Sequence, residues 1–253
     1  MNIAVVTGAS SGIGKEYVKA IAEMYPSLDE IWILARRKDR LEMLANEIIS
    51  PNCRAVQCDI TNESDIEHYK NLLNETQANV KILVNNAGFG KLGYFEDIDV
   101  VSTAGMTRLN CEALTVITSI TLPHMKENAQ IINISSIASF VPNARMAVYC
   151  STKAFVTSFS KALREELKRK KINVLAVCPG PMDTEFLPVA NIEPGTSRTF
   201  DTLPRVKPAE VAKKSLVAAR KKRAVYTNHF FYKFYRILSK ILPHSILMKI
   251  SAT

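Results

Sequence analysis

Short runs of apolar, largely β-branched residues alternate with longer stretches of helical periodicity along most of this chain. These runs predict strands at 3–6, 31–34, 54–57, 81–84, 130–134 and 172–177. The amphipathic stretches between them lie near 13–24, 38–49, 63–76, 100–127 and 147–170. Strands separated by helices at this rhythm form a parallel sheet with helices on both faces and right-handed crossovers. The alternation predicts an α/β fold with a doubly wound parallel sheet.

The length of the chain, 253 residues, suits one large domain of this kind. We expect that domain over 1–225, followed by a basic amphipathic extension over 226–253. Within the domain, the segment 181–207 contains several prolines and little periodicity. Long loops beside an α/β sheet often close over a ligand, so this segment is expected to border the substrate.

The cysteines and histidines argue against a disulfide framework and against a metal site. The five cysteines include no C-x-x-C pair, and the four histidines are scattered along the chain. The first apolar run begins at Ile3, with no basic segment or cleavage site before it. We therefore expect no signal peptide and a reducing, cytoplasmic location.

The net charge of +9 is unevenly distributed along the chain. Residues 205–253 carry 12 Lys/Arg and one acidic residue, whereas the other 204 residues carry 21 basic and 23 acidic groups. The body of the protein is thus near neutral, and no base-reading module is recognisable. A charge confined to one end favours a membrane surface or a partner over nucleic acid.

A glycine-rich turn joins the first strand to the first helix. It reads Thr-Gly-Ala-Ser-Ser-Gly-Ile-Gly over 7–14, with glycines at Gly8, Gly12 and Gly14. These glycines permit a tight turn and a close backbone approach, and the helix N-terminus can face an anionic pyrophosphate. In this position between strand and helix, the turn predicts dinucleotide binding on a Rossmann-type sheet.

The end of the second strand distinguishes NADP from NAD. NAD-binding proteins commonly place a carboxylate there, but this chain has Arg36 and Arg37, with no acidic residue before Asp39. A guanidinium is a planar, permanently charged partner for a 2′-phosphate, and Ser10 and Ser11 could add hydroxyl donors. NADP(H) is favoured, and a solvated charge cluster at the helix start remains the alternative.

Tyr149 and Lys153 are spaced one helical turn apart, so they share a helix face. A free phenol has a pKa near ~10 and is a poor acid or base at neutral pH. A neighbouring ammonium stabilises the phenolate and is expected to lower that pKa toward the working range. The pair alone is a weak signal, because this spacing is common by chance.

Together with its other motifs, the chain resembles the short-chain dehydrogenase/reductase family over about 1–225. The motifs that carry the resemblance are Thr7–Gly14, Asp59, Asn85–Gly88, Asn110, Ser135–Ser136, the Tyr149/Lys153 pair and Pro179–Thr184. The resemblance implies catalytic roles for Tyr149 as acid/base, Lys153 as its partner and ribose ligand, and Ser136, rather than Ser135, as the group that binds the substrate oxygen. It implies that Asn110 holds a proton-relay water.

The resemblance also implies the cofactor contacts. Asp59 and Ile60 would meet the adenine, and Thr184 would meet the nicotinamide carboxamide. The full implied set is Gly8, Ser10, Ser11, Gly12, Ile13, Gly14, Arg36, Arg37, Asp59, Ile60, Asn86, Ala87, Gly88, Tyr149, Lys153, Pro179, Gly180, Met182 and Thr184. The pair Arg36 and Arg37 resembles the NADP-preferring members, and relatives of this kind are commonly dimers or tetramers.

The expected activity is NADP(H)-dependent reduction of a ketone or aldehyde, or oxidation of the secondary alcohol. The substrate is expected to be hydrophobic, such as a steroid, an acyl group or another lipophilic carbonyl, because the segment 181–207 is rich in apolar residues and the tail resembles the steroid and ketoacyl reductase branch. The alternatives are a non-catalytic NADP(H)-sensing or scaffold protein on the same fold and an NAD-dependent alcohol oxidase.

The C-terminal segment 229–250 predicts an amphipathic helix that ends at Pro243 and a second short apolar stretch at 246–248. The apolar side consists of Phe231, Phe234, Leu238, Ile241 and Leu242, and the opposite side of His229, Lys233, Arg236 and Lys240. Three interpretations remain open: a helix resting on an anionic membrane, a helix at a subunit interface or over the substrate, and a helix packed into the core. No apolar run approaches the ~20 residues that span a bilayer.

Overall fold

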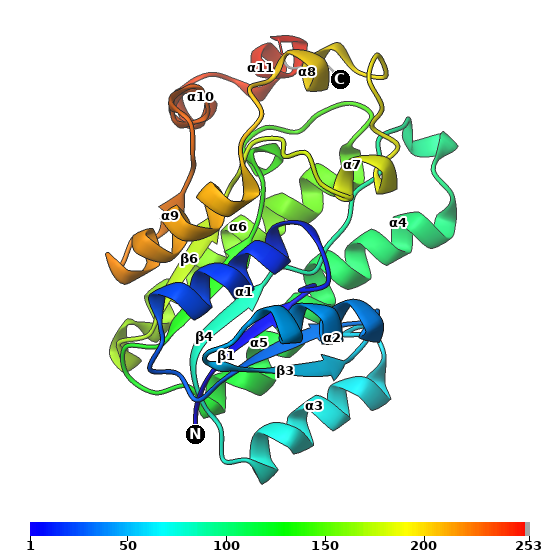
Figure 1. Cartoon of the computed structure of the whole chain (residues 1–253). Helices are drawn as coiled ribbons and strands as arrows, with labels where there is room; N and C mark the ends of the chain where they lie inside the picture. Colours follow the sequence, from blue (N-terminus) through cyan, green and yellow to red (C-terminus); the bar gives the residue numbers. More distant parts are fainter. Residues whose placement is uncertain (251–253) are drawn as a thin grey trace.

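A seven-stranded, entirely parallel sheet runs through the centre of the molecule, in the order β3-β2-β1-β4-β5-β6-β7. The computed structural model describes residues 1–250 (Figure 1). The strands are β1 (Asn2–Thr7), β2 (Glu30–Ala35), β3 (Asn52–Gln57), β4 (Asn79–Asn85), β5 (Gln130–Ile134), β6 (Asn173–Val177) and β7 (Val225–Tyr226). The chain moves outward in one direction from β1 to β3 and in the other from β4 to β7. Ligands of such sheets bind at this reversal, beyond the carboxyl ends of the strands.

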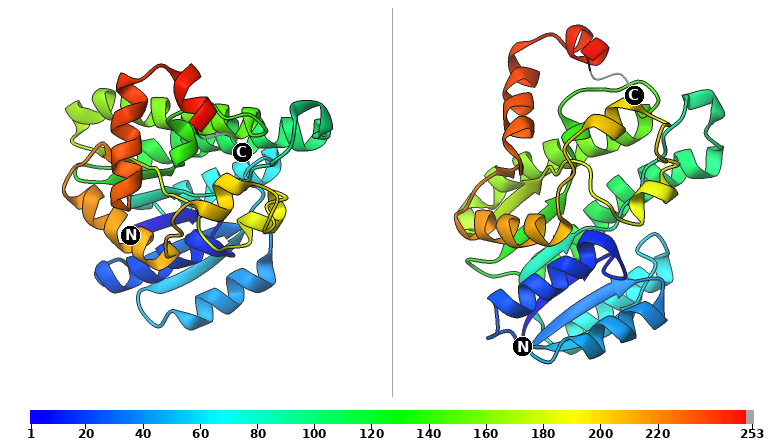
Figure 2. Two further views of the ribbon diagram at one scale, coloured as in Figure 1. Left: turned by 90° about the horizontal axis from the view of Figure 1, so that it is seen from above. Right: turned by 45° about the horizontal axis from the view of Figure 1, so that its top comes forward.

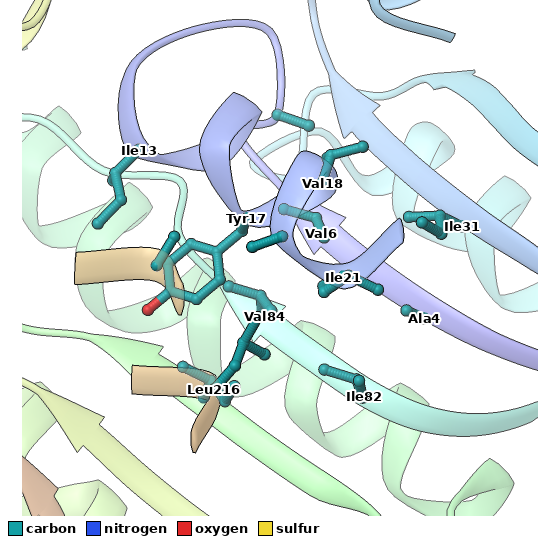
Figure 3. Packing of buried hydrophobic residues seen from close by; sticks show 14 of the residues in the cluster. Ala4, Val6, Ile13, Tyr17, Val18, Ile21, Ile31, Ile82, Val84 and Leu216 are labelled. Carbon is teal, nitrogen blue, oxygen red and sulfur yellow. The ribbon is translucent and has the colours of Figure 1, made fainter. Parts of the chain in front are cut away.

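Helices cover both faces of the sheet. One face is covered by α1 (Gly12–Met24), α2 (Lys38–Glu47) and α9 (Pro208–Arg220). The other is covered by α3 (Glu63–Glu75), α5 (Leu114–Thr121) and α6 (Ala147–Leu167). Figure 3 shows Tyr17 and Ile21 of α1 lying over the strand residues Val6 and Val84. The fully buried Tyr17 hydroxyl is 2.5 Å from the Ser215 hydroxyl, which links α1 to α9.

The long helix expected over 100–127 is interrupted. It consists of α4 (Val100–Thr107), a π-helical segment η2 (Arg108–Ala113) and α5, followed by the 3₁₀ turn η3 (Leu122–His124). The other short elements are η1 (Phe95–Asp97), η4 (Ile137–Ser139), η5 (Lys168–Lys170), α7 (Phe186–Val189) and α8 (Arg198–Thr202). Two helices complete the described chain, α10 (Phe230–Ile241) and α11 (His244–Ile250).

The predicted fold class and all six predicted strands are confirmed, whereas β7, α9 and the short helices α7 and α8 were not predicted. Strand β7 has two residues, too few for a periodic signal, and it spans the position at which the extension was expected to begin. Helix α9 starts with Pro208 in its first turn, a favourable place for proline that the sequence interpretation overlooked. The segment 181–207, expected as a loop, contains the short helices α7 and α8.

Helix α10 is anchored by one aromatic side chain. Tyr232 is fully buried, and its hydroxyl donates to the Pro204 carbonyl at 2.6 Å. Its ring lies so close to Gly180 that a Cβ there would be 2.1 Å from Tyr232 Cε2. In the right view of Figure 2, α10 (orange to red) lies at the same end of the molecule as 181–207 (yellow). No helix within residues 1–250 is both long and apolar enough to cross a membrane.

Candidate active site

A cavity of about 1170 Å³ lies at the carboxyl ends of the strands. It brings together segments from β1, β2, β4, β5, α6 and the loop after β6. Its predicted lining residues are Gly8, Ser10, Ser11, Gly12, Ile13, Arg36, Arg37, Asp59, Ile60, Asn86, Ala87, Gly88, Ser136, Tyr149, Lys153, Pro179, Gly180, Met182 and Thr184. Gly14 and Asn110 are the two predicted site residues that do not line it, and both lie directly behind its wall.

The glycine turn has the geometry of a phosphate cradle. Gly8 and Gly12 adopt φ values of +64° and +53°, which L side chains rarely adopt. A Cβ at Gly14 would lie 2.3 Å from the Gly8 carbonyl oxygen, so only glycine lets the helix start this close to the turn. No side chain caps the N-terminus of α1, and its first turn has no acidic residue. Its amide groups and the positive end of its dipole therefore fit an anionic pyrophosphate.

Asn86 holds the end of β4 against this turn. Its side-chain amide donates to the Thr7 carbonyl at 2.9 Å and to the Gly8 carbonyl at 3.0 Å. The Thr7 hydroxyl accepts from the backbone of Asn86 and Ala87, at 3.0 and 3.1 Å. Across the cavity, Asp59 lies 4.0 Å from the Arg36 guanidinium. These contacts make Asn86 a positioning residue for the turn, and Asp59 lies beside Arg36 in the cavity lining.

Arg37 connects the glycine turn to the segment after β6. Its guanidinium donates to Ser10 Oγ at 3.0 Å and to Ser11 Oγ at 2.9 Å. It also forms a 2.9 Å ion pair with Glu185, which in turn pairs with Arg40. The hydrogen bonds from Arg40 and Arg37 lower the pKa of the Glu185 carboxyl to about 2. The serines expected near a 2′-phosphate do surround a guanidinium, and a carboxylate that the sequence did not reveal lies beside them.

Tyr149 lies at the centre of the cavity wall, on the first turn of α6. It is buried, and its phenol is hydrogen-bonded to the Ser136 side chain. Burial raises the pKa of Tyr149, the hydrogen bond from Ser136 works against this, and the net direction is upward. The pKa of Tyr149 is therefore not lowered as expected, because the loss of hydration on burial outweighs the contacts that stabilise the phenolate. Tyr149 is held as a protonated phenol.

Lys153 is also buried, one turn along the same helix. Its ammonium donates to the Ile134 carbonyl at 2.8 Å and lies 5.8 Å from the centre of the Tyr149 ring. Burial lowers the pKa of Lys153 to about 8. Ser135 supports this helix, because its hydroxyl donates to the Lys153 carbonyl at 2.8 Å. Ser135 is thus occupied within the fold, whereas Ser136 faces the cavity as expected.

Asn110 occupies the π-helical segment η2, a type of distortion often found at functional sites. Its side-chain amide donates to the Phe89 carbonyl at 2.8 Å and to the Thr152 hydroxyl at 3.0 Å, and its oxygen accepts from the Phe89 amide at 3.0 Å. A Cβ at Gly88 would lie 2.8 Å from this oxygen and 3.4 Å from Lys153 Nζ. Asn110 therefore joins the loop after β4 to the catalytic helix, close to Lys153.

The other half of the cavity is mainly apolar. The rings of Tyr149 and Phe186 are 5.5 Å apart, so the pocket begins beside the phenol. The segment 181–207, expected to border the substrate, contributes Phe186, Leu187, Val189, Phe200 and Leu203, and the segment between β5 and α6 contributes Ala138, Val141 and Met146. Sequence reasoning missed the wall formed by α4, which contributes Val100, Val101 and Ala104. A position of α10 over the substrate was one of the alternatives left open, and α10 contributes Phe231 and Tyr235 to the cavity. The helical periodicity of these segments predicted a buried face, but it did not indicate which part of the protein that face packs against.

A nucleotide cradle, a buried Tyr–Ser–Lys group and an adjoining apolar pocket define a dinucleotide-dependent oxidoreductase. The family model "short chain dehydrogenase" matches residues 2–194. An uncharacterised oxidoreductase of Staphylococcus epidermidis is 31% identical over 184 residues, covering 72% of this chain and 78% of the relative. The chain belongs to the short-chain dehydrogenase/reductase family, and it is an NAD(P)-dependent oxidoreductase acting on CH–OH and C=O groups.

Two solved structures show how closely the fold is shared. A short-chain dehydrogenase from Sphingobium yanoikuyae in complex with NADPH is 29% identical, with a TM-score of 0.80, covering 98% of this chain and 96% of that one. A 3-ketoacyl-(acyl-carrier-protein) reductase from Brucella melitensis complexed with NADH is 28% identical, with a TM-score of 0.77, covering 89% and 96%. The two structures contain different nicotinamide cofactors, so the likeness supports NAD(P)(H) in general.

Proposed function

We propose that this protein is an NADP(H)-dependent reductase of a hydrophobic ketone or aldehyde, such as a steroid, an acyl compound or another lipophilic carbonyl. The observation that carries the proposal is the Ser136–Tyr149 pair, two hydrogen-bonded hydroxyl groups between a nucleotide cradle and an apolar pocket. The phenol of Tyr149 is protonated at neutral pH, which is the form that can donate a proton to a carbonyl oxygen during reduction.

NADP(H) is favoured over NAD(H) by the charges at the adenosine end. Arg37 lies within hydrogen-bond distance of both Ser10 and Ser11, and Arg36 extends from the next position with its side chain exposed. These groups would hold a 2′-phosphate through charge-assisted hydrogen bonds. The amides at the start of α1 would hold the pyrophosphate, and Lys153 would hold the nicotinamide ribose hydroxyls.

The cofactor supplies the hydride, and the protein supplies position and polarisation. Ser136 and Tyr149 donate hydrogen bonds to the carbonyl oxygen, where negative charge develops. Tyr149 then gives its proton to that oxygen. Lys153 stabilises the resulting phenolate, and Asn110 positions a water that returns the proton. In the reverse direction the phenolate accepts the proton of the alcohol.

The decisive experiment is a panel of carbonyl and alcohol substrates, read out as NADPH consumption or NADP⁺ reduction. Tyr149→Phe should reduce turnover by at least about 10³-fold, since it removes the proton donor, while NADPH binding stays nearly unchanged. Undiminished turnover in this variant would refute the role of Tyr149. NADPH binding without turnover of any substrate would favour the sensing or scaffold alternative. A preference for NADH with alcohols alone would favour an NAD-dependent oxidase.

We also propose that the protein acts in the cytoplasm as a homo-oligomer, a dimer or a tetramer. All five cysteines are free, which fits a reducing compartment. On α6 the rings of Phe155 and Phe159 are stacked at 6.0 Å, and Phe155 is 42% exposed. A partly exposed aromatic pair of this kind is typical of a protein–protein contact. Sedimentation velocity would test this assembly, and a monomer at micromolar concentration would contradict it.

A further inference from the structure

Helix α10 packs on the body of the protein with a face other than the apolar side predicted from the sequence. Its buried side is formed by Tyr232, with Tyr235, Arg236 and Ser239 partly covered. Its outward side is apolar: Phe230 is 81% exposed, Ile241 71%, Ile237 56% and Phe234 50%. We call these four residues the α10 ridge. The ridge exposes large apolar side chains to water, which is unfavourable in free energy. Contiguous exposed apolar patches of this kind usually mark a contact with a partner or a membrane.

One flank of the α10 ridge is cationic. Lys233 and Lys240 are exposed beside it, and Arg236 and Lys240 lie close enough to Lys161 of α6 to help lower the pKa of that lysine, after burial. Within residues 1–250, none of these four cations forms a salt bridge with a carboxylate. Segment 229–250 contains no acidic residue at all. A cluster of unpaired cations beside an apolar ridge is complementary to an anionic, apolar partner.

The other flank of the ridge borders the active site. Phe231 and Tyr235 line the same cavity as Tyr149 and Ser136. Helix α11 continues the apolar surface, with Ile246 48% and Met248 37% exposed. Figure 1 places α8, α10 and α11 together at one end of the molecule. The ridge, its cations and the apolar half of the cavity therefore share one end of the protein.

We propose that the α10 ridge docks on an anionic phospholipid bilayer and that the substrate is a lipophilic carbonyl taken up from that bilayer. Phe230, Phe234, Ile237 and Ile241 enter the headgroup–acyl boundary, and Lys161, Lys233, Arg236 and Lys240 contact lipid phosphates. Such placement is typical of interfacial helices, which bury an apolar face while basic residues stay among the headgroups. The choice of substrate rests on the proposed reductase function, whereas the docking does not.

A second copy of the chain is a less suitable occupant of this face. A symmetric contact places the same patch on both partners, so it would bring the two sets of four cations together. Like charges at an interface oppose association, and the ridge offers no carboxylate to pair with them. Eight of the twelve Lys/Arg after position 204 precede α10, so most of the basic charge of this part of the chain lies outside the ridge and its flank. The charge at the ridge itself is what favours lipid.

Vesicle flotation of the full chain tests the docking directly. The protein should float with phosphatidylglycerol/phosphatidylcholine vesicles at about 50 mM NaCl, and much less at about 500 mM, where exposed charges are screened. It should remain unbound with phosphatidylcholine alone. Both Phe234→Ser/Ile237→Ser and Lys233→Gln/Lys240→Gln should reduce the bound fraction about tenfold or more. The matched controls Met43→Ser/Ile49→Ser and Lys168→Gln/Lys170→Gln, at exposed sites elsewhere, should float like the parent.

Three results would overturn the docking. The parent could stay unbound with anionic vesicles at low salt, or the ridge variant could float as well as the parent. Alternatively, the ridge variant could sediment more slowly than the parent, while the parent binds vesicles of none of the compositions tested. That result would assign the face to a contact between copies of the chain. Circular dichroism and NADPH binding of each variant show whether it is folded.

Turnover distinguishes the substrate part from the docking and from the reductase function. NADPH oxidation is measured with a short water-soluble ketone and with a long-chain ketone dissolved in the vesicles. The ridge variant should retain the rate with the soluble ketone and lose about tenfold with the vesicle-borne ketone. Equal rates for parent and variant on the vesicle-borne ketone would overturn delivery from the bilayer. Failure of the parent with both ketones would count against the reductase function and leave flotation as the test of docking.

Discussion

Glu185 is a carboxylate at the place where the 2′-phosphate of NADP(H) is proposed to bind. Its carboxylate pairs with Arg37 and Arg40 beside Ser10 and Ser11, where a 2′-phosphate is expected to bind. A phosphate at this position has to share the two guanidinium groups with a carboxylate, and two anions near one another repel. Glu185 is therefore expected to weaken NADPH binding while leaving NADH binding nearly unchanged.

Glu185→Gln should strengthen NADPH binding by roughly fivefold, which corresponds to the ~1 kcal/mol of an exposed ion pair. Isothermal titration with NADPH, NADH and 2′,5′-ADP would measure this change. The effect should appear with 2′,5′-ADP, which lacks the nicotinamide, and should be absent with NADH. Glu193→Gln, in the same segment, is the control for removing a negative charge. Weaker NADPH binding in Glu185→Gln would show that the carboxylate positions the arginines instead of competing with the phosphate.

Lys153 makes the stability of the cofactor-free protein depend on pH. Its pKa is about 8 in the folded chain, below its ordinary value of 10.5. Between these values the unfolded chain binds the additional proton, so the contribution of Lys153 to stability rises with pH across this window. Below pH 8 the lysine is protonated in both states, and the full cost of burying its charge is present.

Lys153→Met should therefore be more stable than the parent at pH 7, by on the order of 2 kcal/mol once the lost hydrogen bond to Ile134 is included. This advantage should shrink by about pH 9.5, where the folded parent no longer carries the charge. Urea unfolding of both proteins at the two pH values, without cofactor, measures the difference. Lys170→Met, an exposed lysine, should show no such change. An advantage that stays constant with pH would mean that Lys153 is not buried as a titrating group.

At the scale of elements, the π-helical segment η2 determines where Asn110 lies. Asn110 satisfies both backbone groups of Phe89 and bonds the Thr152 hydroxyl. Asn110→Leu should lower the free energy of unfolding by about 2 kcal/mol, because it leaves these groups unpaired, and the melting temperature by roughly 5 °C. Asn110→Asp retains the acceptor for the Phe89 amide, so its melting temperature should lie between those of the parent and Asn110→Leu. Thermal denaturation measures the melting temperatures of both variants, and NADPH turnover is recorded alongside. An unchanged melting temperature in Asn110→Leu would contradict the role of Asn110 in joining the loop after β4 to α6.

The elements differ in how far the sequence determines them. Most of the strands β1 to β6 are predictable because they contain short apolar runs, and β3, which reads Asn-Cys-Arg-Ala-Val-Gln, is predictable from the regular alternation of strands and helices. The η2 segment is not, since apolar periodicity continues smoothly from 100 to 127 and a π turn changes only the register. Helix α10 is predictable as a helix, but its packing face is not. Tyr232, one aromatic residue fitted against Gly180, determines the orientation, and the longer apolar stripe faces solvent.

The same limit applies to the site. Motif residues such as Gly8 and Tyr149 are predictable, because local chemistry requires a given residue type at a given spacing, whereas Ser136 follows from the resemblance to the family. The pairing of Arg37 with Glu185 joins residues 148 positions apart, and no local pattern reports such a contact. The cavity walls from α4 and α10 likewise depend on how whole helices pack. The pKa directions of Tyr149 and Lys153 follow from burial, which motif spacing does not show.

At the scale of the whole molecule, the cavity joins parts of the chain from the glycine turn after β1 to Tyr235 on α10. A ligand that fills it contacts both halves of the sheet, so it should stabilise the fold as one unit. At about 100 times its dissociation constant, such a ligand adds ~2.7 kcal/mol to the free energy of unfolding. For a chain of this size, that corresponds to a rise in melting temperature of roughly 5–10 °C.

This linkage provides a test of cofactor preference that needs no substrate. If the adenosine end selects the 2′-phosphate by about tenfold, NADPH should raise the melting temperature by roughly 3–6 °C more than NADH at equal saturating concentration. Arg37→Gln should remove most of this difference and leave the NADH shift nearly intact, because its guanidinium lies at the 2′-phosphate end and away from the nicotinamide. An NADH shift equal to or larger than the NADPH shift in the parent would contradict the proposed preference, since both cofactors share every other contact with the cavity.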